Sequence, residues 1–172
     1  RLRGRSPRAP RAARDGTDAD TSEAPATRAD QRLSGLGLNV LVADDNVINR
    51  EVASAMLEQL CCRVVIAEDG RAAVEHGRTG NFDVVLMDCQ MPVMDGYEAT
   101  RQIRQWEEVS AQPQRLPIVA LTANALVGDA DVCIEAGMDG HLAKPYTRHQ
   151  LGALMARWLP PHMVEGSVDA PR

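Results

Sequence analysis

Five short apolar runs alternate along the middle of the chain with longer segments of helical periodicity. The runs are continuously apolar, as in Val-Val-Leu-Met at 84–87, and lack the polar alternation of a strand with one exposed face. Runs of this kind are typical of parallel strands that helices cover on both faces. The pattern predicts strands at 39–43, 63–67, 82–87, 118–121 and 141–143.

The segments between these strands place apolar residues three to four positions apart. Val52, Met56 and Leu60 show this spacing. The predicted helices are 46–60, 70–78, 97–108, 125–136 and 147–159. Five strand-then-helix units in about 120 residues predict an α/β fold, with a doubly wound, five-stranded parallel sheet. Ligands of such sheets bind beyond the carboxyl ends of the strands, near the point where the strand order reverses.

Composition divides the chain into three zones. Residues 1–37 are rich in Arg, Ala and Pro and poor in large apolar side chains, so we expect a disordered linker. Residues 38–159 form the expected domain, and 160–172 the expected C-terminal tail. Because the sequence begins with arginine, we expect a piece of a longer protein. The arginines near the start could contact nucleic acid or a membrane, but no aromatic residues are interleaved with them, which argues against this interpretation.

Charge and cysteine usage exclude several classes of protein. The net charge is -5, and eight arginines against five acids leave residues 1–37 at +3 and the remainder at -8. No apolar stretch is long enough to span a membrane, and no signal peptide is recognisable. Cys61, Cys62, Cys89 and Cys133 lack the CxxC spacing of a zinc site, so reduced thiols are expected. These features favour a cytoplasmic location for the domain.

Carboxylates follow two of the predicted strands. Asp44 and Asp45 come directly after 39–43, and Asp88 comes directly after 82–87. If these strands are neighbours, three carboxylates meet in one pocket, where like charges raise each other's pKa or recruit a cation. Oxygen ligands in an open cleft suit Mg²⁺. The alternative interpretation is that Asp44 caps the next helix or that Asp-Asp-Asn forms a turn.

Two further polar residues stand at predicted strand ends. Thr122 follows 118–121, where it could donate a hydrogen bond into the same cleft or simply cap a helix. Lys144 is the only lysine in the chain, which suggests that a compact ammonium is needed there. A cis bond before Pro145 would aim this amine over the sheet edge, but cis is found in only about one X-Pro bond in twenty. The sequence leaves the isomer open.

Four ordered motifs give the chain a specific resemblance to the receiver domain of bacterial two-component response regulators. They are Val-Ala-Asp44-Asp45-Asn46, Leu-Met-Asp88-Cys-Gln-Met-Pro-Val-Met-Asp-Gly, Ala-Leu-Thr122-Ala and Ala-Lys144-Pro. The resemblance covers residues 39–159. It implies a flavodoxin-like (βα)5 sandwich with strand order 2-1-3-4-5.

The resemblance also implies roles for individual residues. Asp88 would be the phosphoacceptor, with a phosphohistidine of a histidine kinase or a histidine phosphotransfer domain as donor. The metal, Mg²⁺ or alternatively Mn²⁺, would be held by Asp45, by Asp88 and by the backbone carbonyl of Gln90. Asp44 would act through water. Lys144 would pair with Asp88 and contact the phosphoryl group, and Thr122 would hydrogen-bond another phosphoryl oxygen.

The same resemblance implies a conformational switch. Thr122 would move toward the phosphate, and the residue three before the lysine would turn inward behind it. That residue is usually an aromatic in the family but is His141 here, which puts the usual rotamer switch in doubt; a half-buried structural histidine is the alternative. Gln90 and Asn124 would tune the lifetime of the phosphate. A dimer would use the face of the fourth helix, fifth strand and fifth helix.

The motifs are most similar to receivers fused to hybrid sensor histidine kinases, notably at Asn49-Arg50. A stand-alone single-domain regulator is the first alternative, and a degenerate receiver that only binds partners is the second. A phosphatase of the haloacid-dehalogenase type would need an aspartate two residues after the nucleophile, but that position is Gln90. The chain contains neither a recognisable kinase segment that carries the phosphorylated histidine nor an ATP-binding kinase part. We therefore do not expect it to phosphorylate itself from ATP.

Overall fold

The computed structural model describes residue 33, residues 35–123 and residues 129–158. Strands and helices alternate through these ranges, as the hydrophobic pattern predicts. The strands are β1 (Asn39–Ala43), β2 (Arg63–Ala67), β3 (Val84–Asp88), β4 (Ile118–Thr122) and β5 (Gly140–Ala143). The helices are α2 (Val47–Gln59), α3 (Gly70–Thr79), α4 (Gly96–Val109), α5 (Asp129–Ala136) and α6 (Arg148–Arg157).

The five strands are parallel and form one sheet in the order β2-β1-β3-β4-β5. Strand β1 pairs with β2 on one side and β3 on the other, so the order reverses beside β1. This topology is that of the flavodoxin-like doubly wound fold, and it confirms the predicted fold class. It also brings the carboxyl ends of β1 and β3 side by side.

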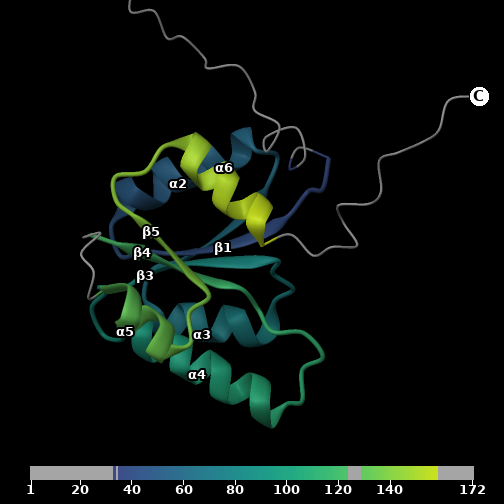
Figure 1. The fold of residues 1–172 in the computed structure, drawn as a ribbon, viewed down its shortest axis with the longest axis vertical. Helices are drawn as coiled ribbons and strands as arrows, with labels where there is room; N and C mark the ends of the chain where they lie inside the picture. The colour runs from purple at the N-terminus through teal and green to yellow at the C-terminus, as the bar shows by residue number, and fades with distance from the viewer. Residues whose placement is uncertain (1–32, 34, 124–128, 159–172) are drawn as a thin grey trace, which may run out of the picture.

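Helices cover both faces of the sheet (Figure 1). Helices α2 and α6 lie on one face, and α3, α4 and α5 lie on the other. Each interface has its own cluster of buried apolar side chains: Val40 and Leu86 belong to the first, Leu41 and Met87 to the second. Strands β3 and β4 are buried at every position. The continuous apolar runs are therefore explained by burial on both faces.

Side-chain caps fix where four of the helices begin. Asn46, Asp69, Asp95 and Thr147 accept hydrogen bonds from backbone N–H groups in the first turns of α2, α3, α4 and α6. Such caps satisfy donors that a helix terminus leaves unpaired. Asn46 therefore lies just outside α2, although the helical periodicity predicts a helix that includes it.

A buried ion-pair network holds the opposite end of the sheet. Arg104 of α4 contacts Glu107 and Asp139, each at 2.7 Å, and it also donates to two backbone carbonyls. Its side chain is 10% exposed. The network ties α4 to the loop between α5 and β5, far from the strand ends that carry the predicted site.

Several observed boundaries differ from the predicted ones. Strand β3 begins at Val84, because Asp83 hydrogen-bonds Asn39 through its side chain and its backbone. Leu33 is fully buried and Leu36 packs against the same cluster, so packing extends into the predicted linker. Residues 1–32 and 34 of that linker, residues 124–128 and residues 159–172 lie outside the described residues. None of the described helices is long and apolar enough to cross a membrane.

Candidate functional site

The carboxyl edge of the sheet gathers the polar residues that were predicted from strand ends. Asp44 and Asp45 follow β1, Asp88 ends β3, Thr122 ends β4 and Lys144 follows β5. The register places Ala43 opposite Met87, and Asp88 opposite Leu121. Parallel pairing in this register brings residues that are far apart in the sequence to one edge of the sheet.

Three carboxylates lie together at this edge. One oxygen from each of Asp44, Asp45 and Asp88 lies within 4.8 Å of the others. Asp44 is 1% exposed and Asp88 is 8% exposed, whereas Asp45 faces solvent. Hard oxygen donors on an open rim suit Mg²⁺, which takes one or two carboxylates and retains several waters. The donor set therefore fits the predicted metal.

Lys144 supplies the positive charge of the cluster. Its Nζ lies 2.7 Å from Asp44 Oδ2 and 3.2 Å from Asp88 Oδ2. The resemblance implies a pair with Asp88, but the shorter contact is with Asp44. Burial lowers the pKa of Lys144, but the hydrogen bond that it donates to Asp44 and the two carboxylate charges together raise it above its ordinary value. The peptide bond between Lys144 and Pro145 is cis.

The surroundings of Asp88 shift its pKa in opposite directions. Burial raises the pKa of Asp88; Lys144 lowers it, the charge of Asp44 raises it, and the backbone N–H of Gln90 lowers it. That N–H lies 3.3 Å from Asp88 Oδ1. The net result is a pKa above the ordinary value, so the ionised carboxylate benefits from an additional cation. The carbonyl of Gln90 as a metal ligand stays a prediction.

Thr122 presents a buried hydroxyl at the same edge. The residue is 4% exposed, and its Oγ1 has no hydrogen-bond partner within the described part of the chain. A buried hydroxyl without a partner carries a desolvation cost that a ligand oxygen would remove. The cost is consistent with a ligand-binding role.

The other predicted residues lie around this cluster. Gln90 is exposed in the loop after β3, and Asn124 falls outside the described residues. His141 is exposed on β5, opposite Ala120 and two positions before the residue that pairs with Thr122. The alternative of a half-buried structural histidine is therefore wrong for this conformation.

The loop between β3 and α4 packs tightly against Asp88. Gly96 lies against the backbone carbonyl of Asp88, and a Cβ added at Gly96 would collide with that oxygen. The Gly96 N–H donates to the carbonyl of Cys89 at 3.1 Å. Val93 adopts a φ of 70°, which is unusual for a β-branched residue. Close backbone contacts with Asp88 and Cys89 therefore constrain the conformation of the loop between β3 and α4.

Two side chains outside the predicted set also contact the cluster. The Nδ2 of Asn49 donates to both oxygens of Asp44, and Arg50 donates to the carbonyls of Asp44 and Asp45. Both residues lie in the first turns of α2. Their positions five and six residues after Asp44, just beyond a helix cap, could have indicated these contacts.

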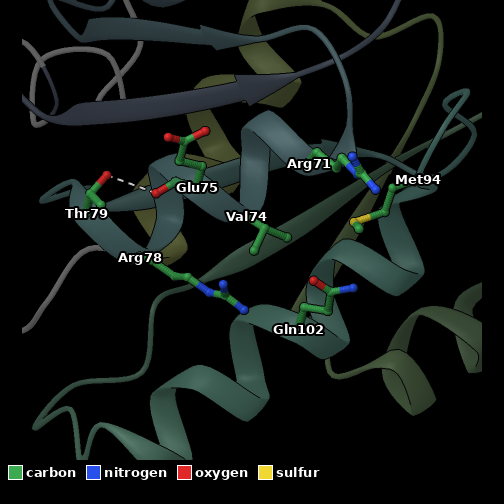
Figure 2. Close-up of a pocket in the computed structure, with 7 residues that line it drawn as sticks. All are labelled: Arg71, Val74, Glu75, Arg78, Thr79, Met94 and Gln102. Atoms are coloured by element: carbon green, nitrogen blue, oxygen red, sulfur yellow. Dashed lines mark hydrogen bonds between the residues drawn. The ribbon is translucent and has the colours of Figure 1, made fainter.

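A separate surface hollow of about 370 Å³ lies between α3 and α4 (Figure 2). Its lining residues include none of the carboxylates of the cluster, and Met94 from the loop after β3 closes one end. Arg71 and Arg78 are exposed along its rim. We therefore assign the chemistry to the sheet edge and not to this hollow.

Comparison with known proteins supports the same assignment. Residues 40–156 match the response regulator receiver domain family. The sensor protein GacS of Pseudomonas syringae pv. syringae is 43% identical over 135 residues, which are 77% of this chain and 15% of GacS. The chain thus spans about a seventh of the length of the curated relatives that it matches first.

Solved structures extend the similarity to three dimensions. The receiver domain of sensor histidine kinase PA1611 from Pseudomonas aeruginosa PAO1, with a magnesium ion in its active site cleft, is 46% identical. The match covers 71% of this chain and 97% of that one, with a TM-score of 0.64. The Saccharomyces cerevisiae receiver domain of Ssk1, crystallised with the phosphotransfer protein Ypd1, is 31% identical. That match covers 70% and 88% of the chains, with a TM-score of 0.68. This chain therefore belongs to the response regulator receiver domain family.

Proposed function

We propose that Asp88 accepts a phosphoryl group from a phosphohistidine in the presence of Mg²⁺, and that the product switches the conformation of the domain. The observation that carries this proposal is the cluster itself. Three carboxylates lie within 4.8 Å of one another, and one amine contacts two of them. The buried hydroxyl of Thr122, which has no hydrogen-bond partner among the described residues, lies at the same edge.

In this transfer the protein contributes mainly the positioning of the reactants and the neutralisation of charge. An oxygen of Asp88 forms a bond to phosphorus while the phosphorus–nitrogen bond of the phosphohistidine breaks; the imidazole leaves with the electron pair and takes up a proton. When bound by Asp45, Asp88 and the carbonyl of Gln90, Mg²⁺ would neutralise charge on the carboxylates and the phosphoryl oxygens. Mn²⁺ would suit the same hard oxygen donors.

Lys144 and Thr122 both lie at the sheet edge, from where each can contact the phosphoryl group. The amine of Lys144 lies between Asp44 and Asp88, from where it can pair with a phosphoryl oxygen. The Thr122 hydroxyl, which has no hydrogen-bond partner among the described residues, can move toward a second oxygen and donate to it. That movement would start the switch, with His141 on the neighbouring strand as its second element.

The phosphate lifetime and the output surface belong to the same proposal. By analogy with the family, Gln90 and Asn124 would tune hydrolysis of the phosphate. A dimer would use α5, β5 and α6, where Val132 and Ile134 are exposed. Apolar side chains on that face support a contact surface.

We further propose that the chain is a cytoplasmic module of a hybrid sensor histidine kinase. The similarity to GacS supports this context, and the Ssk1 complex supports a histidine phosphotransfer domain as a partner. A stand-alone single-domain regulator is the alternative, because it would use the same site as a receiver within a hybrid kinase.

Labelling with acetyl phosphate tests the proposed reaction. Wild-type protein with Mg²⁺ should acquire an acid-stable, base-labile phosphate, which should disappear with EDTA or in Asp88→Asn. Asp69→Asn is the matched control, because asparagine also caps a helix and the Asp69 side chain accepts from Ala72 N–H in α3 and is not one of the three clustered carboxylates. The control should label like the wild type.

Other outcomes would favour other functions. A folded wild type that takes no label, from acetyl phosphate or from a phosphorylated phosphotransfer protein, would indicate a degenerate receiver. Steady release of phosphate from small phosphomonoesters would favour a phosphatase.

A further inference from the structure

The Asp44 carboxylate accepts hydrogen bonds from three groups of the protein. Its Oδ1 accepts from the backbone N–H of Asn46 at 2.9 Å and from Asn49 Nδ2 at 3.2 Å. Its Oδ2 accepts from Asn49 Nδ2 at 3.3 Å and from Lys144 Nζ at 2.7 Å. A carboxylate offers about four lone-pair sites. The Nδ2 of Asn49 lies against both oxygens, so three donor groups occupy most of the acceptor positions of this buried carboxylate.

The other two carboxylates differ from Asp44 in this respect. Asp45 is exposed, and its side chain accepts no hydrogen bond from the residues that the structure describes. Asp88 accepts one hydrogen bond from Gln90 and contacts Lys144, so it keeps free lone pairs. Asp45 and Asp88 therefore have more free acceptor positions for direct ligation of a cation than Asp44 has.

The start of α2 holds Asn49 in place for this contact. The Oδ1 of Asn46 accepts from the N–H groups of Ile48 and Asn49 and so fixes the first turn of the helix. Arg50, the next residue, donates from one guanidinium nitrogen to the carbonyl of Asp44 at 2.9 Å and to that of Asp45 at 3.1 Å. The first turn of α2 therefore holds the Asp44 side chain and the backbone carbonyls of Asp44 and Asp45.

We infer that Asn49 is a positioning residue for the acidic site: by occupying lone pairs on both oxygens of Asp44, it orients that carboxylate and leaves direct metal ligation to Asp45 and Asp88. The bond to Oδ2 also competes with Lys144 for Asp44. Asn49 therefore helps to keep the amine shared between Asp44 and Asp88, where a phosphoryl group can recruit it. The inference rests on the proposed Mg²⁺ site.

Calorimetric titration with Mg²⁺ alone tests this inference without phosphorylation. Residues that orient metal ligands typically change metal affinity by about 10–100-fold when they are replaced. Asn49→Ala should weaken Mg²⁺ binding by about tenfold, the lower end of that range, because Asn46 and Lys144 still hold Asp44. In an Asp44→Ala background the same substitution should change the affinity less than about twofold, since its target is gone.

A matched control separates positioning from general effects. Asn81→Ala makes the same change at an exposed asparagine before β3, at the other end of the sheet, and should leave Mg²⁺ affinity unchanged. Circular dichroism in EDTA should show that all four variants are folded. Because alanine is a good helix former, Asn49→Ala should not disrupt α2.

A second readout uses the single lysine of the chain. Domain labelled with ¹³C-lysine gives one εCH₂ resonance, and in metal-free protein Asn49→Ala should shift it as Lys144 moves toward Asp44. An unchanged Mg²⁺ affinity in Asn49→Ala would overturn the inference, as would an equal loss in the Asp44→Ala background. A wild type that fails to bind Mg²⁺ would instead overturn the proposed function, and the inference with it.

Discussion

Replacing Lys144 with methionine is expected to destabilise the domain, because the substitution removes the cation between two carboxylates. The amine lies 2.7 Å from Asp44 and 3.2 Å from Asp88, and the lysine side chain is 21% exposed. Methionine keeps most of the length of the side chain and loses its charge. The variant therefore leaves Asp44, which is 1% exposed, without a counter-ion.

The distances set the size of the expected loss. With an effective dielectric constant of about 20, unit charges at these separations attract by about 6 and about 5 kcal/mol. Much of this attraction is offset by the cost of removing the amine from water. Breaking a buried ion pair typically costs about 3–5 kcal/mol. Because Lys144 remains partly exposed, we expect the lower end, about 3 kcal/mol.

Urea unfolding followed by the fluorescence of Trp106 and Trp158 measures this loss in EDTA. Arg63→Met removes one positive charge from an exposed position at the opposite end of the sheet and is the matched control. It should change the unfolding free energy by less than about 0.5 kcal/mol.

Saturating Mg²⁺ should restore much of the stability of Lys144→Met, because a ligand that binds the folded state stabilises it. The variant should also bind Mg²⁺ more tightly than the wild type, by about tenfold, since the competing positive charge is gone. A variant as stable as the wild type in EDTA, or one that binds Mg²⁺ more weakly, would refute this account of the cluster.

Three further predictions concern the loop, the distant network and the lysine. Gly96→Ala should destabilise the domain by at least about 2 kcal/mol and abolish labelling, because the added methyl group collides with the backbone of Asp88; normal labelling would contradict this. Arg104→Met should cost about 3 kcal/mol in urea unfolding, the lower end of the range for a broken buried ion pair, because Glu107 loses its cation whereas Asp139 keeps its pair with Arg115; Mg²⁺ affinity should stay unchanged. In metal-free protein, the ¹³C resonance of Lys144 should report a lower pKa in Asp44→Asn than in the wild type, because the hydrogen bond that Lys144 donates to Asp44 is the largest influence that raises it. An equal or higher pKa in that variant would show that Asp44 is not the main partner of the amine.

Much of the fold follows from the sequence because β1 and β3 are buried on both faces. The runs at 40–42 and 84–87 must be continuously apolar for that reason, and their length distinguishes them from helices. The carboxylates could be placed together because the ends of adjacent parallel strands lie at one edge. Strand adjacency itself came from the resemblance, since periodicity does not order strands.

The contacts within the site could not be predicted in the same way. The division of Lys144 between Asp44 and Asp88 depends on differences of tenths of an ångström. The role of Asn49 depends on how the cap at Asn46 turns the chain into α2. Leu33 shows a third difficulty: a single apolar residue in a polar segment packs on the core without a periodic pattern to indicate it.

The location of the phosphoryl group tests the central claim most directly. After incubation with Mg²⁺ and a phosphorylated histidine phosphotransfer domain, borohydride reduction converts an aspartyl phosphate into homoserine, which peptide mass spectrometry can place in the sequence. We predict homoserine at position 88 and aspartate at positions 44 and 45. Phosphate on another residue, or none on a folded protein that binds Mg²⁺, would contradict the account.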